Sequence, residues 1–426
     1  MVDSEGRIRL NPDVEKIVCS VTGKAYDPQG FSKPIGLCSC CPAPGKPLIV
    51  VYKLQQVRVR LEKEGWGKGP GIWRYGALLP VLGMPWRYAP DLRLTRAVRH
   101  EALGGMNGVD LYLKNEGTNP SGSFKDRGLA VGIALGVACG AKRFCLPTQG
   151  NAGVASSLFS TRLHLPGCLV YMPEGYQGNI YHREAEFFGA EVRFAGENIA
   201  ASGRIMRETF AEQLASGELV DMSTFFEPGR LEGKKTMGFE ILENFSPTTL
   251  PEWILYPTGG GTGLVGIWKA FQELAALGAL NPAKHRLPRM VAVQSENCKP
   301  VVEAFERGLD HVEPVQSEGT AHVVHLVEIY VDITHPTIFE LIVEVTSPEG
   351  TTVRLHNRTG GSAANIFGWY DSQLAVDGPG ELAHFIGEGS MGEWQIWVSD
   401  NVGADTGTLN TWCVHVYGGQ PTEVEG

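Results

Sequence analysis

The chain has 426 residues, of which 43% are hydrophobic and 20% charged, and its formal net charge is −10. This length predicts two to four domains, and the apolar content excludes wholesale disorder. No apolar run reaches the roughly 18 residues of a membrane span, and the N-terminus shows no signal-like apolar region. The negative charge disfavours nucleic acid. We therefore expect no membrane or nucleic-acid partner, and a reducing, cytoplasmic location.

Residues 1–50 are predicted to form a small β module. Four cysteines cluster in it and are candidate zinc ligands: Cys19, Cys38, Cys40 and Cys41. A structural zinc site commonly takes one ligand pair from each of two turns. The run CSCC supplies one pair, but Thr22 stands where the partner of Cys19 is expected. Three good ligands leave the tetrahedron open, so we expect a degenerate ribbon that has lost zinc or binds it weakly.

Residues 107–300 alternate short apolar strands with helical patterns. Strands are predicted at 109–116, 142–150, 167–174, 190–196, 253–260 and 289–296. Helices are predicted at 124–141, 151–165, 179–190, 198–215 and 264–277. Such alternation indicates a largely parallel sheet with crossover helices. Ligands of such sheets bind beyond the carboxyl ends of the strands, so the loops after them are the candidate sites.

The first of these loops, residues 115–128, reads NEGTNPSGSFKDRG and contains Lys125. Lys125 follows a turn and opens a helix, where the positive helix end disfavours an ammonium. A lysine that deprotonates readily can form a Schiff base with a carbonyl cofactor. A solvated surface lysine is the alternative interpretation of this loop alone.

Two further loops are rich in glycine. In PTQGNAG, residues 147–153, Asn151 either binds a flat ligand or caps the helix that follows. In PTGGGTGLVG, residues 257–266, glycines and threonines separate a strand from a helix. Backbone N–H groups at such a helix start bind phosphate, and glycine lets the phosphate approach. The third loop therefore indicates a phosphate site.

Together the motifs SFKDRG, QGNAG, EGKKTMGFE and YPTGGGTGLVGIWKAF, in this order, resemble those of fold type II pyridoxal-phosphate (PLP) enzymes. Among these enzymes the chain is most similar to threonine synthases, some of which also begin with a small ribbon. The resemblance implies a three-layer α/β domain and the cofactor PLP. It also implies a small amino-acid phosphate, O-phosphohomoserine, as substrate, converted with water into threonine and phosphate, and a homodimer.

The resemblance also implies a role for each matching residue. Lys125 is the catalytic residue and would hold PLP covalently, with Phe124 beside the ring and Asn151 bonded to the ring oxygen. The phosphate cradle would be Gly259, Gly260, Gly261, Thr262 and Gly263. Arg183 and Ser156 are weak candidates for the substrate phosphate. We assign no chemistry to Glu232, Lys234 and Lys235, because a salt-bridged helix face explains this motif equally well.

The composition changes after residue 308. Residues 311–426 hold sixteen acidic residues and only Arg354 and Arg358 as basic ones, whereas residues 1–310 are net positive. Residues 320–417 alternate in twos between turn signals, which predicts an antiparallel sandwich. We predict five segments: 1–50, 51–308, a linker at 309–319, the sandwich at 320–417 and a tail at 418–426.

The segments ITHPTIFELIVEVTSPEG and GEWQIWVSDNVGADTGTLNTWCVHV resemble the P (homo B) domain that follows the catalytic domain of subtilisin-like proteases. This resemblance implies a β-sandwich that sometimes binds calcium. Four aspartates are candidate calcium ligands: Asp332, Asp371, Asp400 and Asp405. Solvated turn aspartates are the alternative.

The chain departs from the PLP-enzyme pattern after residue 308, where the late elements of that domain and its partner for the pyridine nitrogen do not follow. We therefore expect an incomplete domain with exposed apolar faces and a weakened cofactor site. Two other functions stay open. One is a catalytically dead remnant whose sandwich binds proteins or calcium. The other is a different fold type II activity, such as an amino-acid dehydratase or a cysteate synthase.

Overall fold

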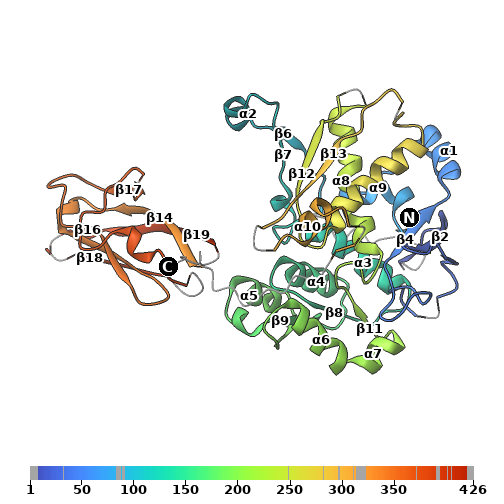
Figure 1. Ribbon diagram of the computed structural model, residues 1–426, viewed down its shortest axis with the longest axis horizontal. Coiled ribbons are helices and arrows are strands. Elements are labelled where there is room, and N and C mark those ends of the chain that lie inside the picture. Colours follow the sequence, from blue (N-terminus) through green and yellow to red (C-terminus); the bar gives the residue numbers. More distant parts are fainter. Residues whose placement is uncertain are drawn as a thin grey trace. The chain divides into compact units, whose positions relative to one another are not determined.

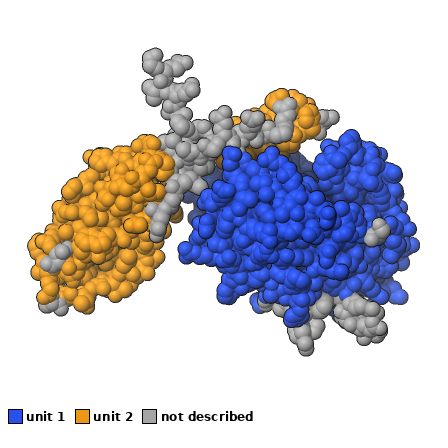
Figure 2. Space-filling view, turned by 90° about the horizontal axis from the view of Figure 1, so that it is seen from below, with its two compact units in different colours: residues 1–294 blue, residues 295–426 orange. Residues whose placement is uncertain are grey.

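The computed structural model describes residues 8–419 except 32, 83–87, 89–91, 248, 282, 296–297, 310, 313–322, 371, 390–393, 401 and 404. It divides into two compact units, Met1–Gln294 and Ser295–Gly426 (Figure 2). Each unit has its own apolar core. Most of the predicted linker and tail lies outside the described residues, so the finer segment limits stay predictions. None of the described helices combines the length and apolar character that a bilayer-spanning segment needs.

The N-terminal part of the first unit is a three-stranded antiparallel sheet in the order β3-β2-β4. Its strands are β2 (Val14–Cys19), β3 (Ala25–Tyr26) and β4 (Leu48–Tyr52). Alternate residues of β4 are buried, because one face of the sheet packs on the main core. Around it lie β1 (Arg9–Leu10), which pairs with β5 (Val81–Leu82), helix α1 (Leu54–Glu64) and the short helix η1 (Gly71–Leu78).

A four-stranded parallel sheet in the order β10-β9-β8-β11 follows (Figure 1). Its strands are β8 (Arg143–Pro147), β9 (Leu169–Met172), β10 (Glu191–Phe194) and β11 (Leu219–Asp221). Its helices are α3 (Lys125–Ala138), α4 (Asn151–Arg162), α5 (Ile180–Phe187), α6 (Ile199–Thr209) and α7 (Ala211–Ser216), with the short helices η2 (Glu116–Thr118) and η3 (Glu174–Tyr176). The parallel α/β arrangement is confirmed, but the predicted strands do not share one sheet. Those at 253–260 and 289–296 form a separate parallel pair, and the one at 109–116 pairs antiparallel in a hairpin. The single helix predicted at 198–215 is wrong, because the chain breaks at Phe210. Strand β11 was not predicted.

The rest of the first unit holds the elements that carry the glycine-rich loop. Strands β12 (Trp253–Pro257) and β13 (Arg289–Val293) form a separate two-stranded parallel sheet. Helices α8 (Gly229–Phe245) and α9 (Thr262–Ala276) lie beside them, and a hairpin of β6 (Ala97–Arg99) and β7 (Tyr112–Lys114) carries α2 (Glu101–Asn107). Leu255 is 66% exposed and Val293 45% exposed. The expected exposure of apolar surface therefore occurs on this small sheet.

Helices α3, α8 and α9 pack closely because glycines line their contacts. A Cβ on Gly233 of α8 would lie 1.9 Å from the carbonyl oxygen of Arg127 on α3. A Cβ on Gly266 of α9 would lie 3.0 Å from the carbonyl oxygen of Leu231 on α8. Side chains at these positions would push the helices apart. The glycines thus bring together residues from three separate segments.

The second unit begins with helix α10 (Pro300–Glu306) and continues as two three-stranded antiparallel sheets, β17-β14-β19 and β16-β15-β18. The strands are β14 (Val323–Thr334), β15 (Leu341–Thr346), β16 (Thr352–Asn357), β17 (Ile366–Trp369), β18 (Gln395–Asp400) and β19 (Thr408–Gly419), with the short helices η4 (Ile338–Glu340) and η5 (Leu382–Phe385). Alternate residues of β14, including Val327, Ile329 and Val331, enter the core between the sheets. The predicted antiparallel sandwich is confirmed.

Candidate functional site

Lys125 begins helix α3, directly after Phe124 at the helix N-cap. Its Nζ lies 3.7 Å from the centre of the Phe124 ring. Burial, together with the nearby charge of Arg230, lowers the pKa of Lys125 to about 8. A substantial fraction of this amine is therefore neutral at mildly alkaline pH, as a nucleophile towards a carbonyl group requires.

Lys234 reaches the same aromatic ring from helix α8. Its Nζ lies 5.0 Å from the centre of the Phe124 ring and donates a hydrogen bond to Thr262 Oγ1, 2.5 Å away. The residue is 2% exposed, and among the described residues no carboxylate lies within ion-pair distance of its ammonium. Burial and the charges of Arg230 and Lys125 hold the pKa of Lys234 well below its usual value.

The interpretation of the EGKK motif as a salt-bridged helix face is therefore wrong for Lys234. It is correct for Glu232 and Lys235. Lys235 lies 2.5 Å from Glu232 and 2.9 Å from Glu273, and all three side chains are buried. Lys269 pairs with the same two carboxylates, and the Tyr52 hydroxyl donates to Glu232. This network joins β4, α8 and α9, and it does not include Lys234.

Arg230, one helical turn before Lys234, is a further cation of the site and is buried like Lys234. Its guanidinium donates to the Met222 carbonyl, and its Nε has no hydrogen-bond partner among the described residues. Glu227 is the nearby carboxylate, and it accepts from the backbone N–H groups of Gly229 and Arg230. Burial raises the pKa of Glu227 to about 7, so it offsets the positive charge only in part. The cluster Lys125, Arg230 and Lys234 thus favours an anionic ligand.

The glycine-rich loop joins β12 to α9 beside this cluster. Gly261 has a φ of +83°, which favours glycine, and Thr262 opens the helix. A Cβ on Gly263 would lie 1.9 Å from the hydroxyl of Tyr256. That hydroxyl is buried and has no hydrogen-bond partner among the described residues, and the Tyr256 ring meets the Phe124 ring edge-on at 5.7 Å. The loop therefore offers free N–H groups at a helix start, next to an unpartnered hydroxyl.

Asn151 is the first residue of α4, beyond the carboxyl end of β8. Gly150 occupies the N-cap position and makes no side-chain cap, so the interpretation of Asn151 as an ordinary N-cap is wrong. The two weak candidates for the substrate phosphate have structural explanations. Ser156 is buried with its Oγ 3.1 Å from Cys168 Sγ, and Arg183 is exposed on α5.

Comparisons with known proteins agree with this site. Residues 89–365 match the family described as pyridoxal-phosphate dependent enzyme. The chain belongs to this family. Threonine synthase of Methanocaldococcus jannaschii is 30% identical over 304 residues, which cover 71% of each chain. Threonine synthase of Methanosarcina acetivorans is 30% identical over 274 residues, or 64% of each chain, and that of a Synechocystis strain is 32% identical over 46% of this chain and 48% of that relative. The chain thus spans about half to seven tenths of these relatives.

Solved structures show a more distant likeness. The processed form of threonine deaminase isoform 2 from Solanum lycopersicum is 20% identical, with a TM-score of 0.41 over 51% of this chain and 56% of that chain. Maize serine racemase is 19% identical, with a TM-score of 0.44 over 54% of this chain and 65% of that chain.

The residues present fit the cofactor of the family. A flat ring can pack near Phe124, and the phosphate can meet the N–H groups of residues 259–263, which lie near the buried cations. The amine of Lys125 has the lowered pKa that covalent attachment requires. Two residues of this site, Arg230 and Tyr256, were missed from the sequence. The i, i+4 spacing of Arg230 and Lys234 on one helix was the available signal for Arg230.

Residues 324–416 match the proprotein convertase P-domain, which confirms the second predicted resemblance. The two matched ranges overlap at 324–365, and the structure places these residues in the sandwich. The predicted calcium ligands do not form one cluster there. Asp400 lies near His335 and Glu340, whereas Asp332 accepts a hydrogen bond from Asn410. Asp371 lies outside the described residues, and neither Asp332 nor Asp405 joins a metal-sized group of described side chains.

Proposed function

We propose that this chain is a PLP-dependent lyase of the threonine-synthase type, which converts O-phosphohomoserine and water into threonine and phosphate. The observation that carries the proposal is the approach of Lys125 and Lys234 to one aromatic ring, with the charge of Arg230 nearby, beside the glycine-rich loop. Both the cofactor and this substrate carry a phosphate dianion. A site with more buried cations than carboxylates suits two such anions.

The loop and Lys234 hold the cofactor phosphate in this proposal. Backbone N–H groups at the start of α9 would donate to it, and Lys234, which also donates to Thr262, would add a charged donor. Phe124 would pack beside the cofactor ring, and the Asn151 amide would donate to the ring oxygen. When bound, PLP supplies the electron sink that stabilises a substrate carbanion.

Lys125 moves the protons of the reaction. Its amine accepts a proton from a substrate carbon and later returns one, which requires a pKa near the working pH. Arg230 keeps that pKa low through its nearby charge, and its unpartnered Nε is available to a second anion, such as the substrate phosphate. Burial of the cluster excludes bulk water and strengthens these interactions.

The test is phosphate release from O-phosphohomoserine by the full chain loaded with PLP. We expect stoichiometric formation of threonine and phosphate, and no release by Lys125→Ala. Keto-acid formation from serine or threonine, without phosphate release from O-phosphohomoserine, would instead indicate a dehydratase. Bound PLP without turnover of any of these substrates would contradict the proposal and favour the catalytically dead remnant.

A further inference from the structure

We propose that the N-terminal module binds one zinc ion through four thiolates, those of Cys19, Cys38, Cys40 and Cys41. The ligand atoms of all four residues lie within 4.8 Å of one another. The Sγ atoms of Cys19 and Cys41 are 3.7 Å apart, and those of Cys40 and Cys41 are 4.0 Å apart. A regular tetrahedron with Zn–S bonds of about 2.3 Å has S···S edges of about 3.8 Å. Two S···S separations therefore match the edges of such a tetrahedron, and the others are at most 4.8 Å.

The structure corrects the expectation that the tetrahedron lacks a ligand. Thr22 does replace the second cysteine of the first turn, but the loop of residues 38–41 supplies three sulfurs instead of two. The third sulfur reaches the group because the loop turns back after Cys38. The turn brings Cys41 to within 3.7 Å of Cys19 at the end of β2, measured between the Sγ atoms. The pattern of paired turns predicts an incomplete site because it does not include a third ligand from the second turn.

Backbone and hydroxyl donors around the sulfurs support a thiolate cluster. The N–H of Lys46 donates to Cys38 Sγ at 3.2 Å, and the N–H of Thr22 donates to Cys19 Sγ at 3.5 Å. The Thr22 hydroxyl lies 3.2 Å from Cys40 Sγ. Donors of this kind orient metal ligands and stabilise their negative charge. Thr22 thus serves as a supporting residue at the place where a ligand was expected.

The donor set selects the class of metal. Four soft thiolates in a tetrahedral arrangement favour zinc or iron, and a closed site without an open position is typical of structural zinc. Cys19 and Cys38 are buried, so the metal would be sheltered from solvent. A structural ion here fastens the loop of residues 38–45 to the sheet β3-β2-β4.

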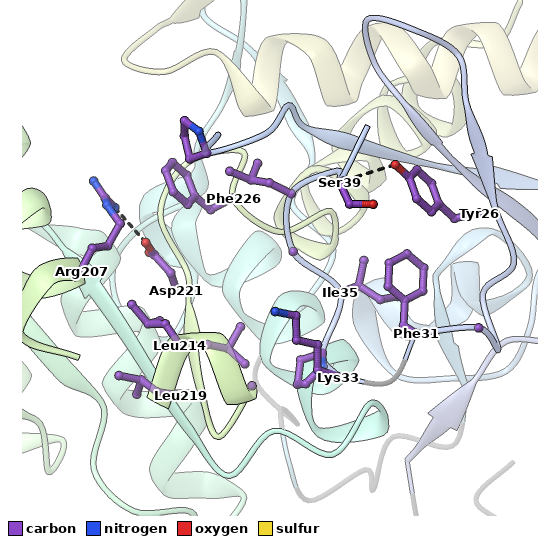
Figure 3. A pocket seen from close by; sticks show the side chains of 17 residues that line it. Tyr26, Phe31, Lys33, Ile35, Ser39, Arg207, Leu214, Leu219, Asp221 and Phe226 are labelled. Carbon is purple, nitrogen blue, oxygen red and sulfur yellow. Dashed lines mark hydrogen bonds and ion pairs between the residues drawn. The ribbon is translucent and has the colours of Figure 1, made fainter. Parts of the chain in front are cut away.

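The loop held by the cluster also forms part of a cavity of about 490 Å³ (Figure 3). Ser39, between two of the proposed ligands, donates its backbone N–H to the hydroxyl of Tyr26 at 3.3 Å. Figure 3 shows both side chains beside Phe31 and Ile35, with Arg207 and Asp221 on another side of the cavity. Zinc would therefore keep this wall of the cavity in place, and the wall would loosen without the metal.

The experiment is elemental analysis of the full chain, purified under reducing conditions without added metal. We expect about one zinc per chain, and loss of most of it in Cys19→Ser and in Cys41→Ser. Cys298→Ser is the matched control, because this cysteine is exposed and outside the cluster, and it should keep the zinc. Full zinc content in both cluster variants, or iron in place of zinc, would overturn the proposal.

A second measurement does not depend on whether the variants fold. The zinc of the wild-type chain is removed with a chelator under reducing conditions, and Co²⁺ is then added. We expect the visible bands of tetrahedral Co²⁺ and the near-ultraviolet bands of thiolate-to-cobalt charge transfer, saturating at about one Co²⁺ per chain. Absence of both sets of bands while the thiols stay reduced would overturn the zinc site. Either result is independent of PLP binding and of the lyase activity.

Discussion

The ammonium of Lys234 on helix α8 donates a hydrogen bond to the hydroxyl of Thr262, the first residue of helix α9. This bond joins a buried cation to the loop that is proposed to hold the cofactor phosphate. The cation has no ion-pair partner among the described residues, so its burial is unfavourable until an anion arrives. Such a group lowers the stability of the ligand-free chain and raises its affinity for an anion.

Replacement of Lys234 is therefore expected to have opposite effects on binding and on stability. A hydrogen bond to a charged group contributes about 1.5–3 kcal/mol, so Lys234→Met should weaken PLP binding by about 10- to 100-fold. The same change should raise the urea midpoint of the ligand-free chain, because an unpaired buried ammonium is removed. Equilibrium titration with PLP and with pyridoxal, which lacks the phosphate, checks the role. Equal weakening of both ligands would show that Lys234 does not act through the phosphate.

The lowered pKa of Lys125 predicts a pH dependence for covalent attachment of PLP. Only the neutral amine attacks a carbonyl, so the initial rate of attachment should rise about tenfold per pH unit below pH 8 and level off above it. Borohydride trapping followed by peptide mapping measures attachment at Lys125 itself. Lys125→Ala gives the background. A rate that still rises at pH 10, as for an ordinary lysine, would show that burial does not lower this pKa.

The glycine contact between α3 and α8 predicts that alanine has opposite effects on stability at two helical glycines. Gly233→Ala places a Cβ against the backbone carbonyl of Arg127, which cannot move without the helix, so unfolding should become about 1–3 kcal/mol easier. Gly105→Ala on α2 has open space around its Cβ and should instead stabilise by up to about 1 kcal/mol. Urea unfolding followed by tryptophan fluorescence compares the two. Similar unfolding free energies for both variants would contradict the close packing of α3 and α8.

Replacement of Arg127 tests how much a buried charge network contributes to the free energy of unfolding. It is fully buried, bonded through Nε to Glu116 at 2.6 Å and through both terminal nitrogens to Glu240. Arg127→Met leaves these carboxylates without their main partner. It should lower the free energy of unfolding by about 3–5 kcal/mol. Arg286→Met removes an exposed pair with Glu252 and should cost at most about 1 kcal/mol. Comparable losses in the two variants would show that the Arg127 network contributes little.

Much of the architecture follows from patterns within short stretches of sequence. The alternation of strands and helices between residues 107 and 300 predicts a parallel sheet, and the period of two beyond residue 320 predicts the sandwich. Lys125 at a helix start and the glycines of residues 259–263 are also visible locally, because helix ends and tight loops depend on neighbouring residues. The break at Phe210 was missed because the apolar pattern continues through it.

The site itself depends on contacts between distant segments. Lys234 looks like one more charged residue of a helix face until α3, α8 and α9 are packed through their glycines, which turn it towards Phe124 and Thr262. The four cysteines look like an incomplete set until the loop of residues 38–41 folds back on the end of β2. The sequence by itself determined most of the elements and several reactive candidates, such as Lys125 and the four cysteines. Only the tertiary structure decided which cations are buried without partners and which sulfurs meet, because burial and distance arise from packing across the chain.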